Sequence, residues 1–442
     1  MAKKTFRIVT LGCKVNQYES AYLEEAFRDK GWSRAERRAS ADLVVINTCV
    51  VTSRASYQSR QAIRKAIREN PEARIVATGC YAQIDPEALA QIQGLSLIAG
   101  NTWKGRLPRV LFEDADAAWP CVLQEPFPSK PEFEVLPVRG HPGRTRAFLK
   151  IQDGCRSFCT YCIVPYARGG LRSLAPDGVL KALHGFCREG YQEVVLTGIH
   201  LGKYGVDLDP PTHLKALLRR IGREGLPLRV RISSLEPEEI DAELVDLVAT
   251  EPWVCPHLHM PMQSGDNDIL KRMNRKYTAE AFSEMVESLH QRLPEAGIGA
   301  DVLVGFPGET EKAFENTRSR IEALPLSYLH VFRYSPRPGT PAAGFPDPVP
   351  SAVAKERAAV LRELGKSKRQ AFYRVCLGKV YPVIAESWEG RASGWARGLA
   401  DNYLPVGFSS GHDPGGKVLQ VHAERLCRDG VAGRIVYPAT EI

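Results

Sequence analysis

The sequence of 442 residues predicts an α/β protein with a Rossmann-like N-terminal domain around a parallel sheet, a central partial (β/α)6 barrel and a small C-terminal β-barrel. Two observations predict this class. Apolar runs rich in Val and Ile alternate with amphipathic helical stretches, which is the pattern of parallel sheets covered by helices. The last part instead holds short strand-like runs broken by glycine. We place these parts at residues 1–115, 146–370 and 371–442, with a connector at 116–145.

Three strand-like runs in the N-terminal domain each end in a cysteine. They are Ile8–Cys13, Leu43–Cys49 and Ile75–Cys80, and helical stretches fill the gaps between them. The carboxyl ends of parallel strands meet at one edge of a sheet, and ligands gather at that edge. We therefore expect the three cysteines to lie close together.

The connector is proline-rich and lacks both helical and strand periodicity. After it, strand-like and helical runs alternate again. Six strands without a closing seventh and eighth predict an open, partial barrel. The six runs are 148–152, 193–197, 229–233, 257–262, 299–304 and 328–334.

A helix is expected from Pro350 to Val375, because apolar residues recur there at helical spacing. Short runs interrupted by glycine follow it and predict the small β-barrel. They are 378–385, 394–399, 417–422 and 433–436.

Composition limits the partners and the compartment. Lys and Arg total 59 against 51 Asp and Glu, and the resulting net charge of +8 fits a polyanionic partner. No apolar stretch approaches the roughly 18 residues of a membrane-spanning helix, so we expect a cytoplasmic protein without a membrane partner. The cytoplasm keeps thiols reduced, so the 11 cysteines should be metal ligands, catalytic thiols or buried apolar residues.

The most specific motif is a cysteine loop at the start of the predicted barrel. Cys155, Cys159 and Cys162 are separated by three and then two residues. Three thiolates on one loop can hold three irons of a [4Fe–4S] cluster and leave the fourth iron open to another ligand. The alternatives are a zinc site or thiols packed in a loop. Zinc prefers four ligands, and no fourth Cys or His lies at a suitable spacing.

This spacing, with an aromatic residue before the third cysteine, resembles the radical S-adenosylmethionine (SAM) superfamily. The resemblance implies a radical SAM barrel in which the three cysteines are the catalytic cluster ligands and the open iron binds SAM. Gly198 and Gly305 follow predicted strands and resemble positions that cradle SAM in this superfamily, although such glycines more often serve turns. Ser233 and Gln263, at two further strand ends, are weaker candidates for SAM contacts.

The three cysteines of the N-terminal domain have two interpretations. Each alone is most simply a buried thiol, whereas three at one sheet edge favour a second cluster. The runs Leu11–Gln17, Asn47–Cys49 and Thr78–Cys80 resemble the N-terminal domain of the methylthiotransferases. The resemblance implies that these cysteines hold an auxiliary [4Fe–4S] cluster that takes part in sulfur delivery. The ligands so expected are Cys13, Cys49 and Cys80.

Other segments resemble one branch of the methylthiotransferases. The tail is similar to their TRAM RNA-binding module. Lys14–Gln17, Gly198–Gly205 and Ser233–Pro237 resemble the branch that modifies N6-threonylcarbamoyladenosine next to the anticodon of tRNA. The resemblance implies an enzyme that adds a methylthio group to C2 of this adenosine, using two [4Fe–4S] clusters and SAM.

The implied partners are tRNA, SAM, an electron donor such as a flavodoxin or ferredoxin, and a sulfur source. Alternative substrates within the family are isopentenyladenosine in tRNA and a ribosomal protein. An alternative from another class is a non-catalytic iron–sulfur electron-transfer protein, which would need neither an open iron nor a six-stranded barrel.

The remaining candidate ligands are expected to be structural. His257 and His259 alternate along one predicted strand, and paired histidines in a strand are more commonly packed or hydrogen-bonded than metal-bound. Five cysteines share no spacing and are predicted to be structural thiols: Cys121, Cys187, Cys255, Cys376 and Cys427.

Overall fold

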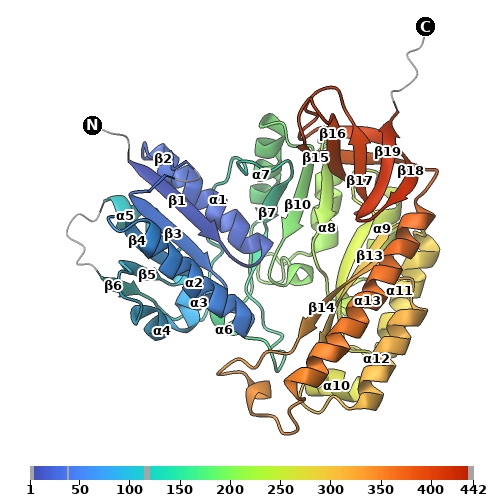
Figure 1. The fold of residues 1–442 in the computed structure, drawn as a ribbon, viewed down its shortest axis with the longest axis horizontal. Coiled ribbons are helices and arrows are strands. Elements are labelled where there is room, and N and C mark those ends of the chain that lie inside the picture. Colours follow the sequence, from blue (N-terminus) through green and yellow to red (C-terminus); the bar gives the residue numbers. More distant parts are fainter. Residues whose placement is uncertain (1–3, 37–38, 114–119, 437–442) are drawn as a thin grey trace.

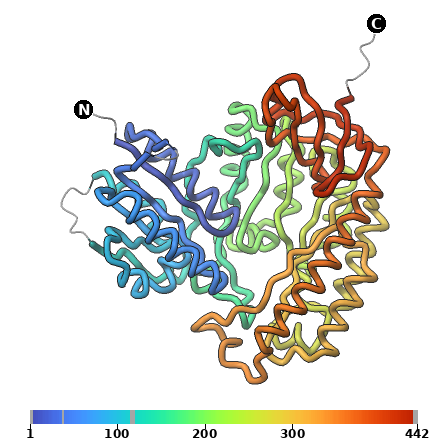
Figure 2. The backbone as a smooth tube through the Cα atoms, viewed as in Figure 1, coloured from blue at the N-terminus to red at the C-terminus, as the bar shows by residue number. Residues whose placement is uncertain are grey.

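The computed structural model describes residues 4–36, 39–113 and 120–436 (Figure 1). The expected boundary between the N-terminal domain and the connector, at residues 115 and 116, lies outside the described residues. The chain forms a parallel-sheet domain, a central barrel-like domain and a closed β-barrel, as predicted. The backbone trace shows the first and last of these on either side of the central domain (Figure 2).

The N-terminal domain is a six-stranded parallel sheet with helices on both faces. The strand order is β2-β1-β3-β4-β5-β6. The strand Leu43–Thr48 in the middle of the sheet is buried along its whole length, which matches the continuous apolar run in the sequence. The strands are β1 (Thr5–Thr10), β2 (Ser33–Arg34), β3 (Leu43–Thr48), β4 (Arg74–Gly79), β5 (Leu97–Ala99) and β6 (Cys121–Leu123). The helices are α1 (Lys14–Asp29), α2 (Ser53–Glu69), α3 (Cys80–Ile84), α4 (Pro86–Ala90) and α5 (Leu107–Phe112), with the 3₁₀ helix η1 (Asn101–Trp103).

The connector differs from the prediction at its start. Strand β6 lies within the predicted connector and pairs with β5 at the edge of the N-terminal sheet. Three residues are too few to show a strand periodicity, so the sequence pattern missed this strand. Residues 124–146 contain no helix or strand, as expected for a connector.

The central domain contains the six predicted parallel strands, hydrogen-bonded as two three-stranded sheets in the orders β11-β10-β7 and β12-β13-β14. The strands are β7 (Ala147–Lys150), β10 (Glu193–Thr197), β11 (Arg229–Ile232), β12 (His257–Gln263), β13 (Gly297–Val304) and β14 (Tyr328–Arg333). The surrounding helices are α7 (Pro176–Arg188), α8 (Leu214–Arg223), α9 (Ala242–Thr250), α10 (Asn267–Arg272), α11 (Ala279–Arg292) and α12 (Glu311–Ala323), with the 3₁₀ helices η2 (Leu201–Lys203), η3 (Pro237–Glu239) and η4 (Pro341–Gly344).

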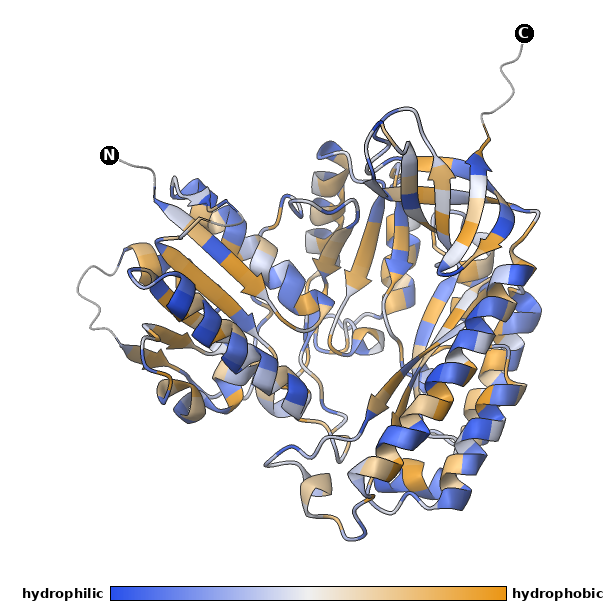
Figure 3. Cartoon of the chain, in the orientation of Figure 1, coloured by the Kyte–Doolittle hydropathy of each residue, from blue (hydrophilic) through white to orange (hydrophobic). Residues whose placement is uncertain are grey.

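Alternation along these strands separates an apolar core from a polar interior. On β13, for example, Ile298, Ala300 and Val302 belong to the hydrophobic core, while Asp301 does not. Coloured by hydropathy, the strands are largely apolar and the helices are largely polar on their outer faces (Figure 3). The polar side chains that point away from the core are therefore available to a site inside the barrel.

The two ends of the cysteine loop lie close together, and we call the short ladder that joins them the neck of the loop. Strand β8 (Gln152–Asp153) pairs with β9 (Arg172–Ser173) in an antiparallel ladder, and the loop and helix α6 (Val164–Arg168) lie between them. A Cβ on Gly154 would lie 1.9 Å from the carbonyl oxygen of Gly170. Only glycine fits where the two sides of the neck approach this closely.

The tail is a closed barrel of five strands in the order β15-β16-β17-β19-β18. It follows the predicted long helix, α13 (Ser351–Val375). The sequence pattern missed β17, which begins at a proline and contains a glycine and so has weak strand character. The strands are β15 (Val380–Trp388), β16 (Trp395–Ala400), β17 (Pro405–Ser409), β18 (Val418–Cys427) and β19 (Gly430–Ile435).

The other two parts of the chain enclose the central domain. At β7, one edge strand of the central domain, Glu19 of α1 lies 3.4 Å from Lys150 Nζ. On the other side, Arg337 after β14 donates a 3.0 Å hydrogen bond to Ser56 of α2. The tail covers the amino ends of the strands, where Arg231 of β11 donates to backbone carbonyls of the tail. In the described ranges we find no helix with both the length and the apolar character to cross a membrane.

Candidate active site

The cysteine loop lies at the carboxyl ends of the central strands. Backbone hydrogen bonds from Cys155 to Gly169 (3.0 Å) and from Thr160 to Met273 (3.1 Å) hold the loop in place. Each thiol of Cys155, Cys159 and Cys162 interacts electrostatically with the other two. The structure therefore brings the three predicted ligands together.

A buried histidine contacts the first of these thiols. The Sγ of Cys155 lies 3.4 Å from Nδ1 of His200, whose Nε2 lies 2.8 Å from Oε1 of Glu239. Burial alone would lower the pKa of His200, but its hydrogen bonds to Cys155 and Glu239 raise it to about 10. Burial would likewise raise the pKa of Cys155, yet the bonds from His200 and Ser157 lower it. The loop thus favours the thiolate that an iron ion requires.

A guanidinium contacts the second thiol. Arg275 Nη1 donates a 3.3 Å hydrogen bond to Sγ of Cys159, and the same side chain pairs with Glu236. Burial raises the pKa of Cys159, and the positive charge of Arg275 opposes that effect. The ion pair with Glu236 holds the guanidinium against the loop.

The other trio sits at the carboxyl edge of the N-terminal sheet, as predicted. Cys13 is the N-cap residue of α1, Cys49 follows β3, and Cys80 is the first residue of α3. Two glycines with positive φ precede the first and third of them. A Cβ on Gly79 would lie 2.6 Å from the Thr48 carbonyl oxygen, so the strand ends can approach only because this residue is glycine.

The number of thiols in each trio fits an iron–sulfur cluster better than a zinc ion. A structural zinc site needs four ligands. Among the described residues, the group of three candidate ligands whose ligand atoms all lie within 4.8 Å contains no cysteine. Three thiolates can hold three irons of a [4Fe–4S] cluster and leave the fourth open to another ligand.

The chemistry of the thiols agrees with bound iron. Burial raises the pKa of Cys49 to about 11 and that of Cys162 to about 12. Such thiolates are stable inside a protein only beside a compensating positive charge. Iron ions supply that charge, so the donor sets fit [4Fe–4S] clusters.

One arginine links the two cysteine groups. Arg168 of α6, six residues after Cys162, is almost fully buried and donates a 3.2 Å hydrogen bond from Nε to Sγ of Cys80. Its Nη groups bond to Asn16 and Glu19 of α1. The chain segment that carries the cysteine loop therefore also contacts a ligand of the N-terminal trio.

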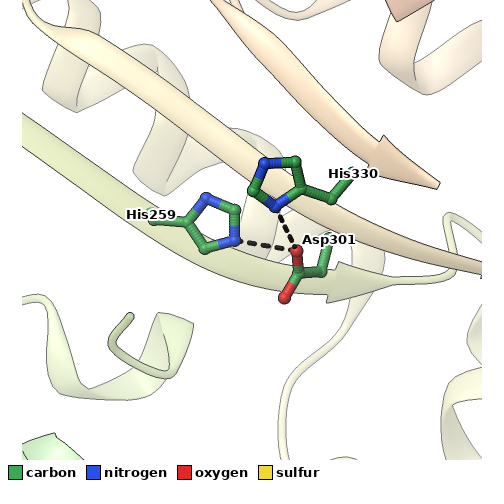
Figure 4. Close-up of side chains that lie close together, drawn as sticks. All are labelled: His259, Asp301 and His330. Carbon is green, nitrogen blue, oxygen red and sulfur yellow. Dashed lines mark hydrogen bonds and ion pairs between the residues drawn. The ribbon is translucent and has the colours of Figure 1, made fainter. Parts of the chain in front are cut away.

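The barrel interior carries a histidine–aspartate–histidine cluster on three neighbouring strands (Figure 4). Asp301 Oδ1 of β13 lies 2.8 Å from Nε2 of His259 on β12 and 3.2 Å from Nδ1 of His330 on β14. These bonds lower the pKa of Asp301 although burial would raise it. The hydroxyl of Tyr328 lies 3.1 Å from Nδ1 of His259 and 2.7 Å from Nε2 of His257. Both predicted structural histidines are thus hydrogen-bonded, as expected.

Lys14 is the first residue of α1 and directly follows Cys13. Its side chain is partly buried, and it makes no hydrogen bond or ion pair with the described residues. Burial lowers its pKa, as does the charge of Arg146, while Cys13 and Asp301 act in the opposite direction.

The four predicted SAM contacts all lie at the carboxyl ends of central strands. Gly198 follows β10, Ser233 follows β11, Gln263 ends β12 and Gly305 follows β13. The positive φ of Gly305 (77°) also serves packing, because a Cβ there would lie 2.6 Å from Ala354 of α13. Their role in SAM binding stays a prediction.

Sequence reasoning gave no role to several side chains that contact these groups. Arg168 and Arg275 are far in sequence from the thiols that they contact, Cys80 and Cys159, and Glu239 is far in sequence from its partner His200. No local spacing marks them. His200 lies within Gly198–Gly205, a segment that resembles one branch of the methylthiotransferases. That resemblance was the signal that could have identified it.

Comparison with known families matches two parts of the chain. Residues 5–100 match a model described as uncharacterized protein family UPF0004. Residues 149–321 match the radical SAM superfamily. The two matches cover the sheet domain with the N-terminal trio of cysteines and the barrel with the cysteine loop.

Curated relatives match nearly the whole chain. The threonylcarbamoyladenosine tRNA methylthiotransferase MtaB of Bacillus subtilis is 39% identical over 93% of this chain and 92% of its own length. The protein of the same name from Aquifex aeolicus is 39% identical over 93% and 98%. A tRNA-2-methylthio-N(6)-dimethylallyladenosine synthase from Moorella thermoacetica is 35% identical over 87% and 88%.

A solved structure shares the fold. The radical SAM methyltransferase TsrM from Kitasatospora setae aligns with a TM-score of 0.56 at 18% identity, covering 77% of this chain and 75% of that one. At this identity the likeness shows the fold alone. The curated relatives that match nearly the whole chain also show the family. Their names fit the family models that match the segments with the two cysteine groups. The chain belongs to the tRNA methylthiotransferases of the radical SAM superfamily.

Proposed function

We propose that this enzyme adds a methylthio group to C2 of N6-threonylcarbamoyladenosine next to the anticodon of tRNA. The observation that carries the proposal is the 39% identity, over 93% of the chain, to a relative named for this reaction. The site supports it, because the chain segment that carries the cysteine loop also contacts the N-terminal trio through Arg168 and Cys80.

The enzyme uses SAM and [4Fe–4S] clusters. We assign one cluster to Cys155, Cys159 and Cys162, and the auxiliary cluster to Cys13, Cys49 and Cys80. When bound, the first supplies the electron that cleaves SAM to a 5′-deoxyadenosyl radical, and the second takes part in sulfur delivery. Radical chemistry suits the substrate, because the adenine C2–H bond is neither acidic nor otherwise activated.

The chain's own residues supply positioning and electrostatics. His200 contacts the thiol of Cys155 and favours its thiolate, Arg275 donates a hydrogen bond to the thiol of Cys159, and Arg168 donates one to that of Cys80. The N-terminal domain and the tail both contact the central domain, through Glu19 with Lys150 and through the tail carbonyls with Arg231. Gly198, Ser233, Gln263 and Gly305 border the proposed SAM site.

The tail barrel and the net charge of +8 support a tRNA partner. Each Lys or Arg that contacts a phosphate releases counterions and strengthens binding. We expect the enzyme to act in the cytoplasm, to receive electrons from a flavodoxin or ferredoxin, and to draw on a separate sulfur source.

The test is turnover by reconstituted enzyme under anaerobic, reducing conditions with SAM. Three anticodon stem-loop RNAs are compared, with threonylcarbamoyladenosine, isopentenyladenosine or unmodified adenosine at the same position. Mass spectrometry of the nucleosides should show the methylthio product only from the first RNA. Product from the isopentenyladenosine RNA alone would assign the enzyme to the branch of its 33–35% identical relatives. Product on a ribosomal protein instead of RNA would also contradict the proposal.

A further inference from the structure

Exposed cations on helices of the central domain have carboxylates beside them. On α8, Arg220 lies 2.7 Å from Asp177, and on α12, Arg318 lies 2.7 Å from Glu315. A cation that is paired in this way adds little to the attraction of a polyanion. These helix surfaces are therefore poor binding sites for one.

Helix α2 of the N-terminal domain has a different charge pattern. It contains five basic residues and a single acidic one, Glu69. Lys65 pairs with Glu69, and Arg60 donates a 2.6 Å hydrogen bond to the hydroxyl of Tyr81. The other three basic residues are exposed and make no hydrogen bond or ion pair with the described residues: Arg54, Arg64 and Arg68. Their guanidinium groups are therefore available to an anionic partner.

These three arginines share one face of α2. The opposite face packs on the sheet through Ile63 and Ala66. At about 100° and 1.5 Å per residue, the arginines fall within an arc of about 80° and extend over about 21 Å of the helix. Tyr57 lies on the same face with 55% of its surface exposed. Cations that contact phosphates beside an aromatic ring that stacks on bases are the combination that binds unpaired nucleic-acid strands.

The first turns of α2 border the candidate active site. The Cys49 N–H donates a 3.2 Å hydrogen bond to Oγ of Ser59, and the Ser53 N–H donates a 2.9 Å bond to Oγ of Ser335 after β14. The other end of α2 lies at the amino edge of the N-terminal sheet, where its C-cap residue Asn70 bonds to the backbone that leads into β3. A strand of RNA that lies along the exposed face of α2 therefore leads toward the cysteine groups.

We propose that the basic face of α2, formed by Arg54, Arg64 and Arg68 with Tyr57, binds the anticodon arm of tRNA. The arginines contact phosphates, and the ring of Tyr57 stacks on an unpaired base of the loop. Tyr57 and Arg54 lie at the end of α2 beside the cysteines, where the loop with the substrate nucleotide has to be. Arg64 and Arg68 lie farther along the helix, on the side of the stem. This inference rests on the proposed function and names the surface that holds the substrate RNA.

The experiment uses one RNA, the anticodon stem-loop that carries threonylcarbamoyladenosine, and four reconstituted proteins. Besides the wild type and Tyr57→Leu, one triple variant combines Arg54→Gln, Arg64→Gln and Arg68→Gln. A control triple variant combines Arg219→Gln, Arg220→Gln and Arg318→Gln, which removes the same charge from exposed arginines with acidic partners. Fluorescence anisotropy gives Kd at several salt concentrations. Iron content, RNA-independent 5′-deoxyadenosine formation and steady-state kcat/KM are measured for each protein.

The α2 triple variant should bind the RNA roughly 10- to 100-fold more weakly than the wild type at low salt, because three phosphate contacts are lost. The slope of log Kd against log salt should become shallower by about 2 for the same reason. Tyr57→Leu should weaken binding roughly tenfold without changing the slope, because stacking releases no counterions. The control variant should bind within about twofold of the wild type, since its arginines are already neutralised.

Iron content and RNA-independent SAM cleavage should be the same in all four proteins, and kcat/KM of the α2 variants should fall through KM. Equal Kd and salt slope in the wild type and the α2 triple variant would overturn the inference. An equal loss in both triple variants would also overturn it, because the RNA would then respond only to net charge.

The proposed function is judged separately, by whether the wild type forms the methylthio nucleoside. A wild type that binds this RNA without modifying it would contradict the proposed function, whereas the binding measurements would still decide the role of α2.

Discussion

At the scale of the residue, the site depends on backbone positions that only glycine can occupy. Gly154 has a φ of +77° and lies against the opposite side of the neck of the cysteine loop. Gly143 has a similar φ of +75°, but a Cβ there would meet no described atom within 4 Å. A comparison of Gly154 with Gly143 therefore separates the strain of a positive φ from the clash of an added Cβ.

We expect Gly154→Ala to disrupt the cysteine loop and Gly143→Ala to leave it intact. Both changes should cost about 1 kcal/mol of backbone strain. Only the first also pushes a methyl group into the Gly170 carbonyl, so only the first should lose about half of the bound iron and the ability to cleave SAM. Iron analysis of both reconstituted variants decides this, and equal iron in the two would refute the steric argument.

A buried histidine predicts a pH dependence of stability. His141 is almost fully buried, with Nε2 2.8 Å from the Phe148 carbonyl oxygen, and burial lowers its pKa to about 4. Its unfolded pKa is about 6.5, so the unfolded chain binds the proton first as the pH falls. Stability from neutral His141 is therefore complete above pH 6.5 and is lost progressively toward pH 4.

Between pH 7 and pH 5 this effect should remove about 2 kcal/mol of the free energy of unfolding. His141→Gln keeps an N–H donor but does not titrate, so its stability should fall less over the same range. Denaturant unfolding of both proteins at the two pH values measures the difference. Parallel losses would mean that His141 titrates normally in the folded chain.

At the scale of the element, helix α6 joins the two halves of the site. Its Arg168 contacts Cys80, Glu19 and Asp153, and Asn101 of η1 donates a 2.8 Å hydrogen bond to the Ala167 carbonyl oxygen. Ile163 and Ala167 pack into the core of the N-terminal domain. A short helix of one domain thus serves as part of the other.

Arg168→Gln should therefore destabilise the whole chain. The change leaves buried carboxylates of Glu19 and Asp153 with one cation fewer, at a cost of about 3 kcal/mol. The control Arg318→Gln removes an exposed pairing with Glu315 and Glu322 on α12 and should cost much less, because solvent screens exposed ion pairs. Denaturant unfolding compares the two, and similar losses would show that the buried network contributes little.

The elements also show what sequence alone can predict. The six candidate cluster ligands could be singled out because loop spacing and strand ends are local features, and the structure places them in two groups of three. Helix α13 was found because its apolar spacing runs over 25 residues. Strands β6 and β17 were missed, because one has three residues and the other contains proline and glycine.

Contacts between elements that are far apart in the sequence could not be predicted from the sequence. The cluster of His259, Asp301 and His330 exists because parallel register aligns three strands that are far apart in the sequence. Arg168 reaches Cys80 only because two domains pack together. Neither arrangement leaves a spacing that a single sequence can reveal.

At the scale of the whole molecule, the chain consists of a parallel-sheet domain, a central domain and a closed β-barrel that pack against one another (Figure 1). The tail does more than extend the surface for RNA, because Arg229 and Arg231 of the central domain donate to its backbone carbonyls. Tyr403 of the tail stacks on His257, with ring centroids 4.3 Å apart. The tail thus covers the amino ends of the central strands, besides its proposed role in binding tRNA.

We propose a division of labour between the two cysteine groups, with SAM cleavage at Cys155, Cys159 and Cys162 and sulfur delivery at Cys13, Cys49 and Cys80. It is tested by one anaerobic reaction with SAM and the threonylcarbamoyladenosine RNA. Three folded proteins are compared: the wild type, the variant with Cys155, Cys159 and Cys162 changed to Ala, and the variant with Cys13, Cys49 and Cys80 changed to Ala.

Mass spectrometry measures 5′-deoxyadenosine and the methylthio nucleoside in each reaction. The wild type should form both, the first variant neither, and the second variant 5′-deoxyadenosine without the methylthio nucleoside. Methylthio product from the second variant, or 5′-deoxyadenosine from the first, would contradict the account.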